Sequence, residues 1–178
     1  MTKLSALTER FYTQLRKTMT HNVFVYGTLK RNEPNHHWLT NPENGLGKFV
    51  ADGISKHKYP LIIATRYNIP FLLYSRGEGH RVRGEIYEVD DLMLSKLDIL
   101  EDHPNYYERE KDSIEILKGD TREEKTVDCW VYFLKKFRPD LLSRPNMDDY
   151  SSKGSHGLPY MERSKRDPNF NYITEVRD

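Results

Sequence analysis

Glu101 is the first candidate in this sequence for acid–base chemistry, because of its position in a predicted helix. The segment VDDLMLSKLDILEDHP has apolar residues at helical spacing, an N-cap at Asp90 or Asp91 and a stop at Pro104. Glu101 therefore falls in the last turn of that helix. The alternative interpretation is an ordinary solvated acid at a frayed helix end.

The neighbours of Glu101 predict that its pKa is raised. The negative end of the helix dipole, with Asp98 and Asp102 close in sequence, disfavours a carboxylate anion. Apolar Leu97 and Leu100 limit the hydration of that anion, which acts in the same direction. A carboxyl group with a pKa near neutrality can both accept a proton and return it.

A strand that ends at a glycine is the second candidate. NVFVYGTLKRN, residues 22–32, begins with strand-forming residues and stops at Gly27. The N–H groups of Gly27, Thr28 and Leu29 are then not paired with a sheet, and successive free amides can bind an anion or an oxyanion. The alternative is a plain turn in which Thr28 bonds its own backbone.

Short strands separated by turns must hold these two features in place. The strand candidates are residues 22–26, 59–64, 69–74, 82–89 and 127–134, and the glycine-rich stretch from 44 leads into further strand material. A shorter helix is expected to begin at Pro34 and to close at Pro42. Five or six short strands around one strong helix predict an α+β fold, built as a small mixed β-barrel or a curled sheet.

Composition limits the class of protein. A chain of 178 residues is long enough for one domain with a core, and 12 tyrosines argue against disorder. The net charge of +1 gives no electrostatic case for a nucleic-acid partner. A single cysteine, Cys129, excludes an internal disulfide. The sequence contains no run of 18 apolar residues, so no membrane span is predicted. We therefore expect a soluble cytoplasmic protein, and a monomer.

The two ends of the sequence differ from its middle. Residues 1–21 predict an amphipathic extension, with apolar residues from Leu4 to Met19 at helical spacing. A mitochondrial presequence and an alternative start at Met19 are the other interpretations. Residues 22–160 are the predicted domain, and 161–178 are a polar tail that wraps the domain or is disordered toward its end.

Three apparent motifs carry no prediction. NGLGKF lacks the first glycine and the hydroxyl residue of a phosphate-binding loop. The seven histidines are scattered without metal-ligand spacing, so no metal site is expected. Cys129 lies in the middle of a predicted strand, which favours a buried, inert thiol over a nucleophile.

Several segments together resemble the γ-glutamyl cyclotransferase family, and within it the γ-glutamylamine cyclotransferases, or avirulence-induced-gene-like proteins. These segments are FVYGTLKRNEPNHHWL, YPLIIATRYNIPFLL, GEIYEVD, LDILEDHPNYYERE and DDYSSKGSHGLPY, in that order. They cover residues 22–135 and 148–160. The family's YGTL tetrapeptide matches residues 26–29, and its helix-end glutamate matches Glu101.

The resemblance implies a small mixed barrel with the site in a cavity at its mouth. It implies that Glu101 moves the proton, that the turn binds the substrate, and that no cofactor or metal takes part. The substrate-binding residues would be Tyr26, Gly27, Thr28 and Leu29, with Tyr107 as a candidate pocket residue. The substrate would be a γ-glutamyl amine such as ε-(γ-glutamyl)-lysine, and the products would be 5-oxoproline and the free amine.

Three alternatives stay open from the sequence. The first is a cyclotransferase for other γ-glutamyl compounds, and the second is a hydrolase that releases glutamate. The third is a binding module that keeps the barrel for a protein partner without catalysis. An intact Glu101 together with an intact YGTL turn favours an enzyme over the binding module.

Overall fold

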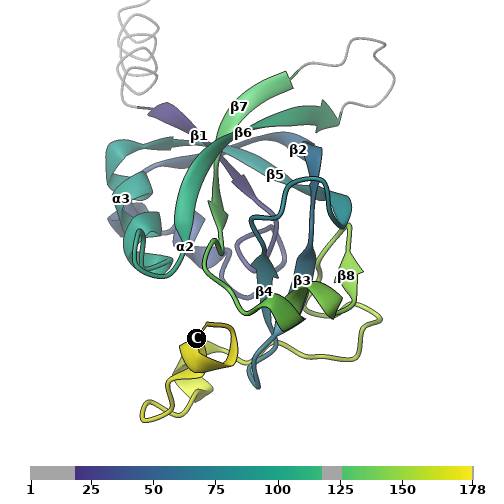
Figure 1. Cartoon of the computed structure of the whole chain (residues 1–178). Coiled ribbons are helices and arrows are strands. Elements are labelled where there is room, and N and C mark those ends of the chain that lie inside the picture. Colours follow the sequence, from purple (N-terminus) through teal and green to yellow (C-terminus); the bar gives the residue numbers. More distant parts are fainter. Residues whose placement is uncertain (1–18, 118–125, 178) are drawn as a thin grey trace, which may run out of the picture.

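Residues 19–117 and 126–177 are described by a computed structural model of the chain (Figure 1). The predicted amphipathic extension over 1–21 lies mostly outside these residues. Most of the charged loop that follows residue 117 also lies outside them.

A closed five-stranded barrel forms the body of the protein (Figure 1). Its strands follow the order β1 (Met19–Val25), β5 (His80–Asp90), β2 (Gly47–Tyr59), β6 (Glu108–Leu117) and β7 (Thr126–Phe133). Neighbouring strands are antiparallel, and the barrel closes by parallel pairing of Val23 in β1 with Trp130 in β7. The predicted mixed barrel is therefore confirmed.

Strand β6 was absent from the sequence-based strand candidates. Its sequence, EREKDSIEIL, is dense in charge, which hides an alternating pattern. The buried members of this pattern are Asp112 and Ile114, and the strand pairs with β7 along its length. This strand of the barrel is thus partly polar, in keeping with the low apolar content of the chain.

A second, three-stranded sheet lies against one end of the barrel (Figure 1). It has the order β4 (Ile69–Leu72), β3 (Leu61–Ala64) and β8 (Asn146–Met147). All four residues of β3 are buried, which explains its continuous apolar run. A parallel bridge between Leu73 and Leu134 connects this sheet to the chain leaving β7.

Helix α3 (Asp91–Leu100) forms as the sequence predicts. The Asp90 side chain accepts a hydrogen bond of 2.8 Å from the Met93 N–H, so Asp90 is the N-cap. The apolar face of the helix is buried, and the helix ends with Glu101 as its C-cap. Capping at the start of α3 and burial of its apolar face therefore fix where Glu101 lies in the structure.

The predicted helix that starts at Pro34 is wrong in its extent. Helix α2 covers only His37–Thr40, and a 3₁₀ turn, η1 (Pro42–Asn44), follows it. The residues before α2 form tight turns instead, because the Asn35 N–H donates to the Thr28 carbonyl at 2.9 Å. This contact folds the chain after β1 back onto its own turn.

The chain after β7 is irregular but packed. It contains three 3₁₀ turns, η2 (Pro139–Ser143), η3 (Arg163–Lys165) and η4 (Tyr172–Glu175). Val176 is fully buried, and its carbonyl accepts a hydrogen bond from the Arg138 N–H at 2.8 Å. Residues 158–177, here called the C-terminal segment, lie at the same end of the barrel as β3 and β4 (Figure 1).

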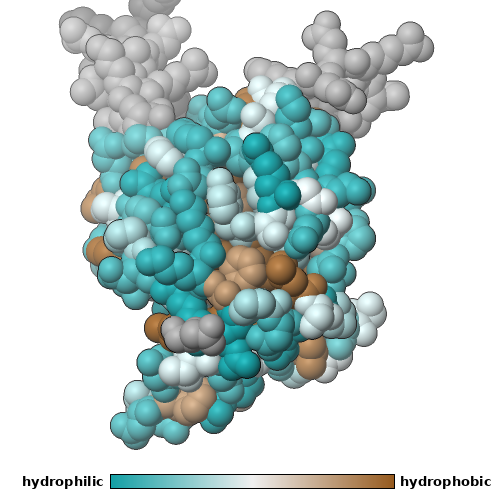
Figure 2. Space-filling view, viewed as in Figure 1, coloured by the Kyte–Doolittle hydropathy of each residue, from teal (hydrophilic) through white to brown (hydrophobic). Residues whose placement is uncertain are grey.

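The outer surface in this orientation is mostly hydrophilic, with apolar side chains gathered near the middle of the face above the C-terminal segment (Figure 2). None of the helices in the described part of the chain is long and apolar enough to span a bilayer.

Candidate active site

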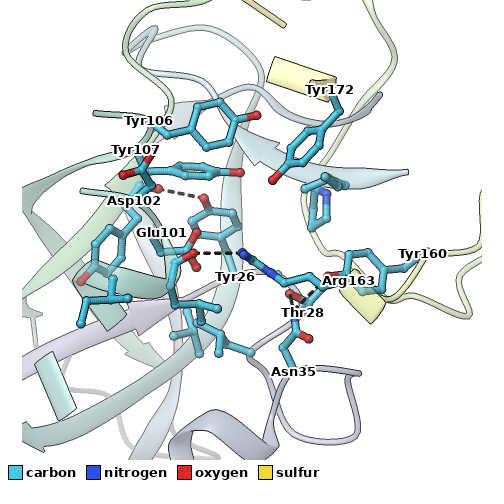
Figure 3. A pocket seen from close by; sticks show the side chains of 18 of the residues that line it. Tyr26, Thr28, Asn35, Glu101, Asp102, Tyr106, Tyr107, Tyr160, Arg163 and Tyr172 are labelled. Carbon is cyan, nitrogen blue, oxygen red and sulfur yellow. Dashed lines mark hydrogen bonds between the residues drawn. The ribbon is translucent and has the colours of Figure 1, made fainter. Parts of the chain in front are cut away.

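One pocket lies where β1 ends, where α3 ends and where the C-terminal segment crosses them (Figure 3). All six residues named from the sequence line it, and further polar residues join them. The lining includes Tyr26, Gly27, Thr28, Leu29, Asn35, Glu101, Tyr106, Tyr107, Tyr160, Arg163, Arg166 and Tyr172. The two features that the sequence placed seventy residues apart therefore share one cavity.

The turn after β1 presents unpaired amides to this pocket. The Lys30 N–H donates to the Gly27 carbonyl at 3.1 Å, and the Arg31 N–H donates to the Glu85 carboxylate at 3.0 Å. Within the described ranges, the N–H groups of Gly27, Thr28 and Leu29 donate to no protein acceptor. A row of free amides at a pocket wall is suited to binding an anion.

Gly27 is needed for close packing rather than for an unusual backbone angle. A Cβ atom at this position would lie 3.1 Å from Cγ of Pro70 in β4. Gly27 is not among the glycines with positive φ. A glycine at residue 27 therefore lets the turn lie against β4 without any shift of the Pro70 ring.

Two side chains of the turn are part of the barrel. The Tyr26 hydroxyl donates to the Tyr132 carbonyl at 2.8 Å, and burial raises the pKa of that hydroxyl. The Leu29 side chain is buried in the hydrophobic core. Tyr26 and Leu29 therefore hold the turn in place.

The plain-turn alternative required the Thr28 side chain to bond its own backbone, and it does not do so. Its hydroxyl oxygen accepts a hydrogen bond of 2.9 Å from the Asn35 side-chain amide. The same amide nitrogen donates to the Tyr160 hydroxyl at 3.0 Å (Figure 3). Asn35 thus links the turn after β1 to the C-terminal segment.

Glu101 carries the unusual electrostatics of the site. Its N–H completes the helix by donating to the Leu97 carbonyl at 2.9 Å. The residue as a whole is partly exposed, but burial of its carboxyl group raises the pKa to about 7. In the described part of the chain no donor is bonded to the carboxylate, which leaves it free to meet a ligand.

The cause of this raised pKa differs from the sequence-based argument. Burial is the main cause, and the positive charge of Arg163 opposes it. Asp98 does not act on Glu101 as expected, because its carboxylate accepts the Tyr132 hydroxyl at 2.7 Å and pairs with Arg109 at 2.9 Å. Its charge is thus neutralised by other partners.

The C-terminal segment supplies residues that the sequence analysis did not select. Arg163 donates to the Leu100 carbonyl at 2.9 Å, one of the free carbonyls at the end of α3. The spacing of arginines and tyrosines in an irregular tail gave no local signal for this contact.

Tyr106 and Tyr107 follow α3 and also line the pocket, with Tyr107 stacked on Phe71 at 5.8 Å between ring centroids. Tyr107 was a candidate pocket residue from the sequence, whereas Tyr106 was not selected.

No cluster of three or more histidine, cysteine or acidic side chains suited to a metal ion occurs among the residues that the structure describes. The polar groups that line the pocket are the carboxyl groups of Glu101 and Asp102, free backbone amides, the Asn35 amide, hydroxyl groups and guanidinium groups.

These features define a class of small barrel proteins in which an acid at a helix end shares a pocket with free amides. Residues 23–152 match the family described as gamma-glutamyl cyclotransferase, AIG2-like. The chain belongs to this family.

Named relatives match most of the chain. A gamma-glutamylaminecyclotransferase C of Danio rerio is 46% identical over 147 residues, covering 83% of this chain and 97% of the relative. A gamma-glutamylaminecyclotransferase of Mus musculus is 44% identical over 147 residues, covering 82% and 99%. The crystal structure of an AIG2-like protein from Mus musculus has a TM-score of 0.76 at 42% identity, covering 83% of this chain and all of that one.

Proposed function

We propose that this protein is a γ-glutamylamine cyclotransferase. It converts a γ-glutamyl amine, such as ε-(γ-glutamyl)-lysine, to 5-oxoproline and the free amine. The observation that carries the proposal is the single pocket in which the Glu101 carboxyl group, with a pKa of about 7, meets the free amides after β1. The relatives that bear this enzyme name match more than four-fifths of the chain.

The reaction needs a base before it needs anything else. The α-ammonium group of the substrate is not nucleophilic, so Glu101 first removes a proton from it. A carboxyl group with a pKa of about 7 is half ionised at neutral pH, and its carboxylate form is basic enough for this transfer. The resulting α-amine then attacks the γ-carbonyl carbon and forms a C–N bond that closes a five-membered ring.

The same group then serves as the acid. When the tetrahedral intermediate collapses, the bond between the γ-carbon and the leaving nitrogen breaks. Glu101 returns its proton to that nitrogen, so the free amine departs and the enzyme is restored. The attacking nitrogen loses a second proton as the ring amide forms, and the released amine takes up a second proton and leaves as an ammonium ion. The protons therefore balance and water is not consumed.

The turn after β1 acts as the anion site. The free N–H groups of Gly27, Thr28 and Leu29 hold either the α-carboxylate of the γ-glutamyl group or the oxyanion that develops on the γ-carbonyl. Because ring closure is intramolecular, fixing the substrate in the folded conformation can supply several kcal/mol of the barrier. Tyr107 borders the same space and completes its wall.

The test is the Glu101→Gln substitution, assayed on ε-(γ-glutamyl)-lysine with mass spectrometry of both products. Loss of one acid–base group lowers rates by about 10²–10⁴-fold, and we expect a fall in kcat of this size with the fold retained. Glu43→Gln is the control, since Glu43 is an exposed acid outside the pocket. Retained activity in the Glu101 variant would contradict the proposal, and glutamate as the product would indicate a hydrolase.

A monomeric state and a cytoplasmic location are also part of this proposal. The single cysteine supports the location, because disulfides are rare in the cytosol. The monomeric state is supported by the sequence, in which no apolar helix face is apparent beyond residues 4–19. Sedimentation of the purified protein and localisation of the tagged chain would test them.

A further inference from the structure

Two arginines enter the pocket from the C-terminal segment, beyond the residues 23–152 that match the family. They are Arg163 and Arg166, and in the described residues neither forms an ion pair with a carboxylate. Arg166 is half-buried, whereas Arg163 is exposed to solvent. A pocket lined by two guanidinium groups that have no carboxylate partner is suited to an anionic ligand.

The two arginines differ in how much of their hydrogen-bonding capacity is used. Arg166 donates to the Met161 carbonyl and to the Tyr160 hydroxyl, at 3.1 and 2.8 Å, and its guanidinium lies 5.2–5.4 Å from the centres of three tyrosine rings. Arg163 has one hydrogen bond, to the Leu100 carbonyl. A guanidinium has five N–H donors, so Arg163 keeps several for a ligand.

A buried phenol in the lining of the same pocket also lacks a partner. Tyr106 is 5% exposed, and its hydroxyl has no hydrogen-bond partner among the described residues. Its ring lies at the same pocket as Arg163, and the hydroxyl groups of Tyr106, Tyr107 and Tyr172 point into a common space (Figure 3). A buried hydroxyl without a partner costs free energy, which a ligand that bonds to it would recover.

The proposed reaction already uses the other groups of the pocket. The free amides after β1 and Glu101 act on the γ-glutamyl half, which all γ-glutamyl amines share. The leaving half therefore meets the remaining polar groups of the lining, which include Asn35, Asp102, Arg166 and the phenols. Among these groups the Arg163 guanidinium keeps the most unused donors. In an isopeptide of lysine the leaving half carries a second carboxylate, whereas a simple amine carries none.

We propose that Arg163, with the Tyr106 hydroxyl, binds the carboxylate of the leaving amine and so selects γ-glutamyl compounds of amino acids linked through a side-chain amine. This inference rests on the proposed function, because it assigns a role within the same pocket. Arg163 is a specificity residue in this scheme. A bond from a guanidinium to a carboxylate is charge-assisted and therefore stronger than a neutral hydrogen bond.

The test compares two substrates that differ by one carboxylate, ε-(γ-glutamyl)-lysine and γ-glutamyl-cadaverine. Assays at pH 8.5 keep Glu101 ionised, so a change in its pKa does not affect the result. A charge-assisted bond of about 1.5–3 kcal/mol corresponds to a change of roughly 10–100-fold. We expect Arg163→Gln to raise KM for the lysine substrate by about this factor and to change KM for the cadaverine substrate by less than about threefold.

Three further variants sharpen the test. Arg163→Lys keeps the charge without the planar fork and should recover part of the preference for the lysine substrate. Tyr106→Phe should raise KM for the lysine substrate by a few-fold. Arg144→Gln, an exposed arginine outside the pocket, should leave both substrates unchanged.

Two results would overturn the inference while leaving the proposed function intact. An equal loss on both substrates would assign Arg163 to the γ-glutamyl half or to the end of α3, and no loss on either would remove it from recognition. If the unmodified protein released 5-oxoproline from neither compound, the proposed function would fail, and this inference with it.

Discussion

The two walls of the pocket are built in different ways. One, here called the barrel wall, consists of the turn at residues 26–29 and the end of α3 at Glu101. The other, here called the tail wall, consists of Tyr160, Arg163, Arg166 and Tyr172. The barrel wall presents backbone amides and one carboxyl group, whereas the tail wall presents only side chains from irregular structure.

Because of this difference, we expect the two walls to differ in how readily they move. The barrel wall is fixed by the ladder between β1 and β5 and by the buried face of α3. The tail wall is held at its end by the buried Val176 side chain and, along the pocket, by contacts between Arg166 and tyrosine rings and by single hydrogen bonds such as Asn35–Tyr160. Each cation–π contact of this kind contributes about 0.5–1 kcal/mol, so we expect the tail wall to open locally far more often than the barrel wall.

Deforming the barrel wall should have the largest effect. We expect Gly27→Val to lower kcat by about 10²-fold or more, because its side chain must displace Pro70 and so disturbs the free amides. Turnover of ε-(γ-glutamyl)-lysine measures this loss.

Gly27→Ala provides a graded control for the same position. Its Cβ would lie 3.1 Å from Pro70 Cγ, so a smaller loss is expected. Adding Pro70→Ala should restore part of the activity of Gly27→Ala. If the double variant were no better than the single one, contact with Pro70 would not be what shapes the turn.

The pH dependence tests the chemistry of the barrel wall. Glu101 must be ionised to accept a proton, and burial raises its pKa to about 7. On the acidic side of the pH–rate profile we therefore expect kcat/KM to fall about tenfold per pH unit below pH 7. Above pH 7 the ionisation of Glu101 should no longer change it. Because the charge of Arg163 lowers this pKa, Arg163→Gln should move the midpoint to higher pH.

A rate profile measured with ε-(γ-glutamyl)-lysine from pH 5 to 8.5 gives this midpoint. A profile with no fall in rate down to pH 5 would show that the working carboxyl group is solvated and has the usual glutamate pKa of about 4.3. Glu43→Gln should leave the profile unchanged, because Glu43 lies outside the pocket.

Loosening the tail wall should have the smallest effect. Arg166→Gln removes the contacts with Tyr67, Tyr160 and Tyr172, and we expect KM to rise by a few-fold with kcat little changed. Hydrogen exchange should accelerate at the Met161 N–H, which donates to the Tyr67 carbonyl, but not in β1 or β5. Equal acceleration in the barrel would mean that the two walls open together, and the expected difference in local opening would be wrong.

The sequence predicted the barrel wall because its signals are local. Strand residues that stop at Gly27, and a helix with an Asp90 cap and a stop at Pro104, mark the ends of two elements. The family resemblance then joined these ends into one site. Strand β6 was missed because Glu108–Leu117 places charged residues on a half-exposed face, where they obscure the alternation.

The tail wall could not be predicted in the same way. Arg163 and Arg166 lie in a polar, proline-containing stretch with no periodic pattern, so nothing local distinguishes them from solvated arginines. Their positions depend on distant partners such as Leu100 and Tyr67. For the Glu101 pKa, limited hydration was among the causes expected from the sequence, and burial is the main cause. The opposing charge of Arg163 was not expected, because that residue lies far away in the sequence.

The order in which the ribosome makes the two walls separates them in time. All five barrel strands have been synthesised by Phe133, but Arg177 is added 44 residues later. At about 5–20 residues per second, this interval lasts roughly 2–9 seconds. For that period a nascent barrel can already display Glu101 and the turn at Gly27 with no tail across them, so chaperones would meet an open cavity before the finished pocket exists.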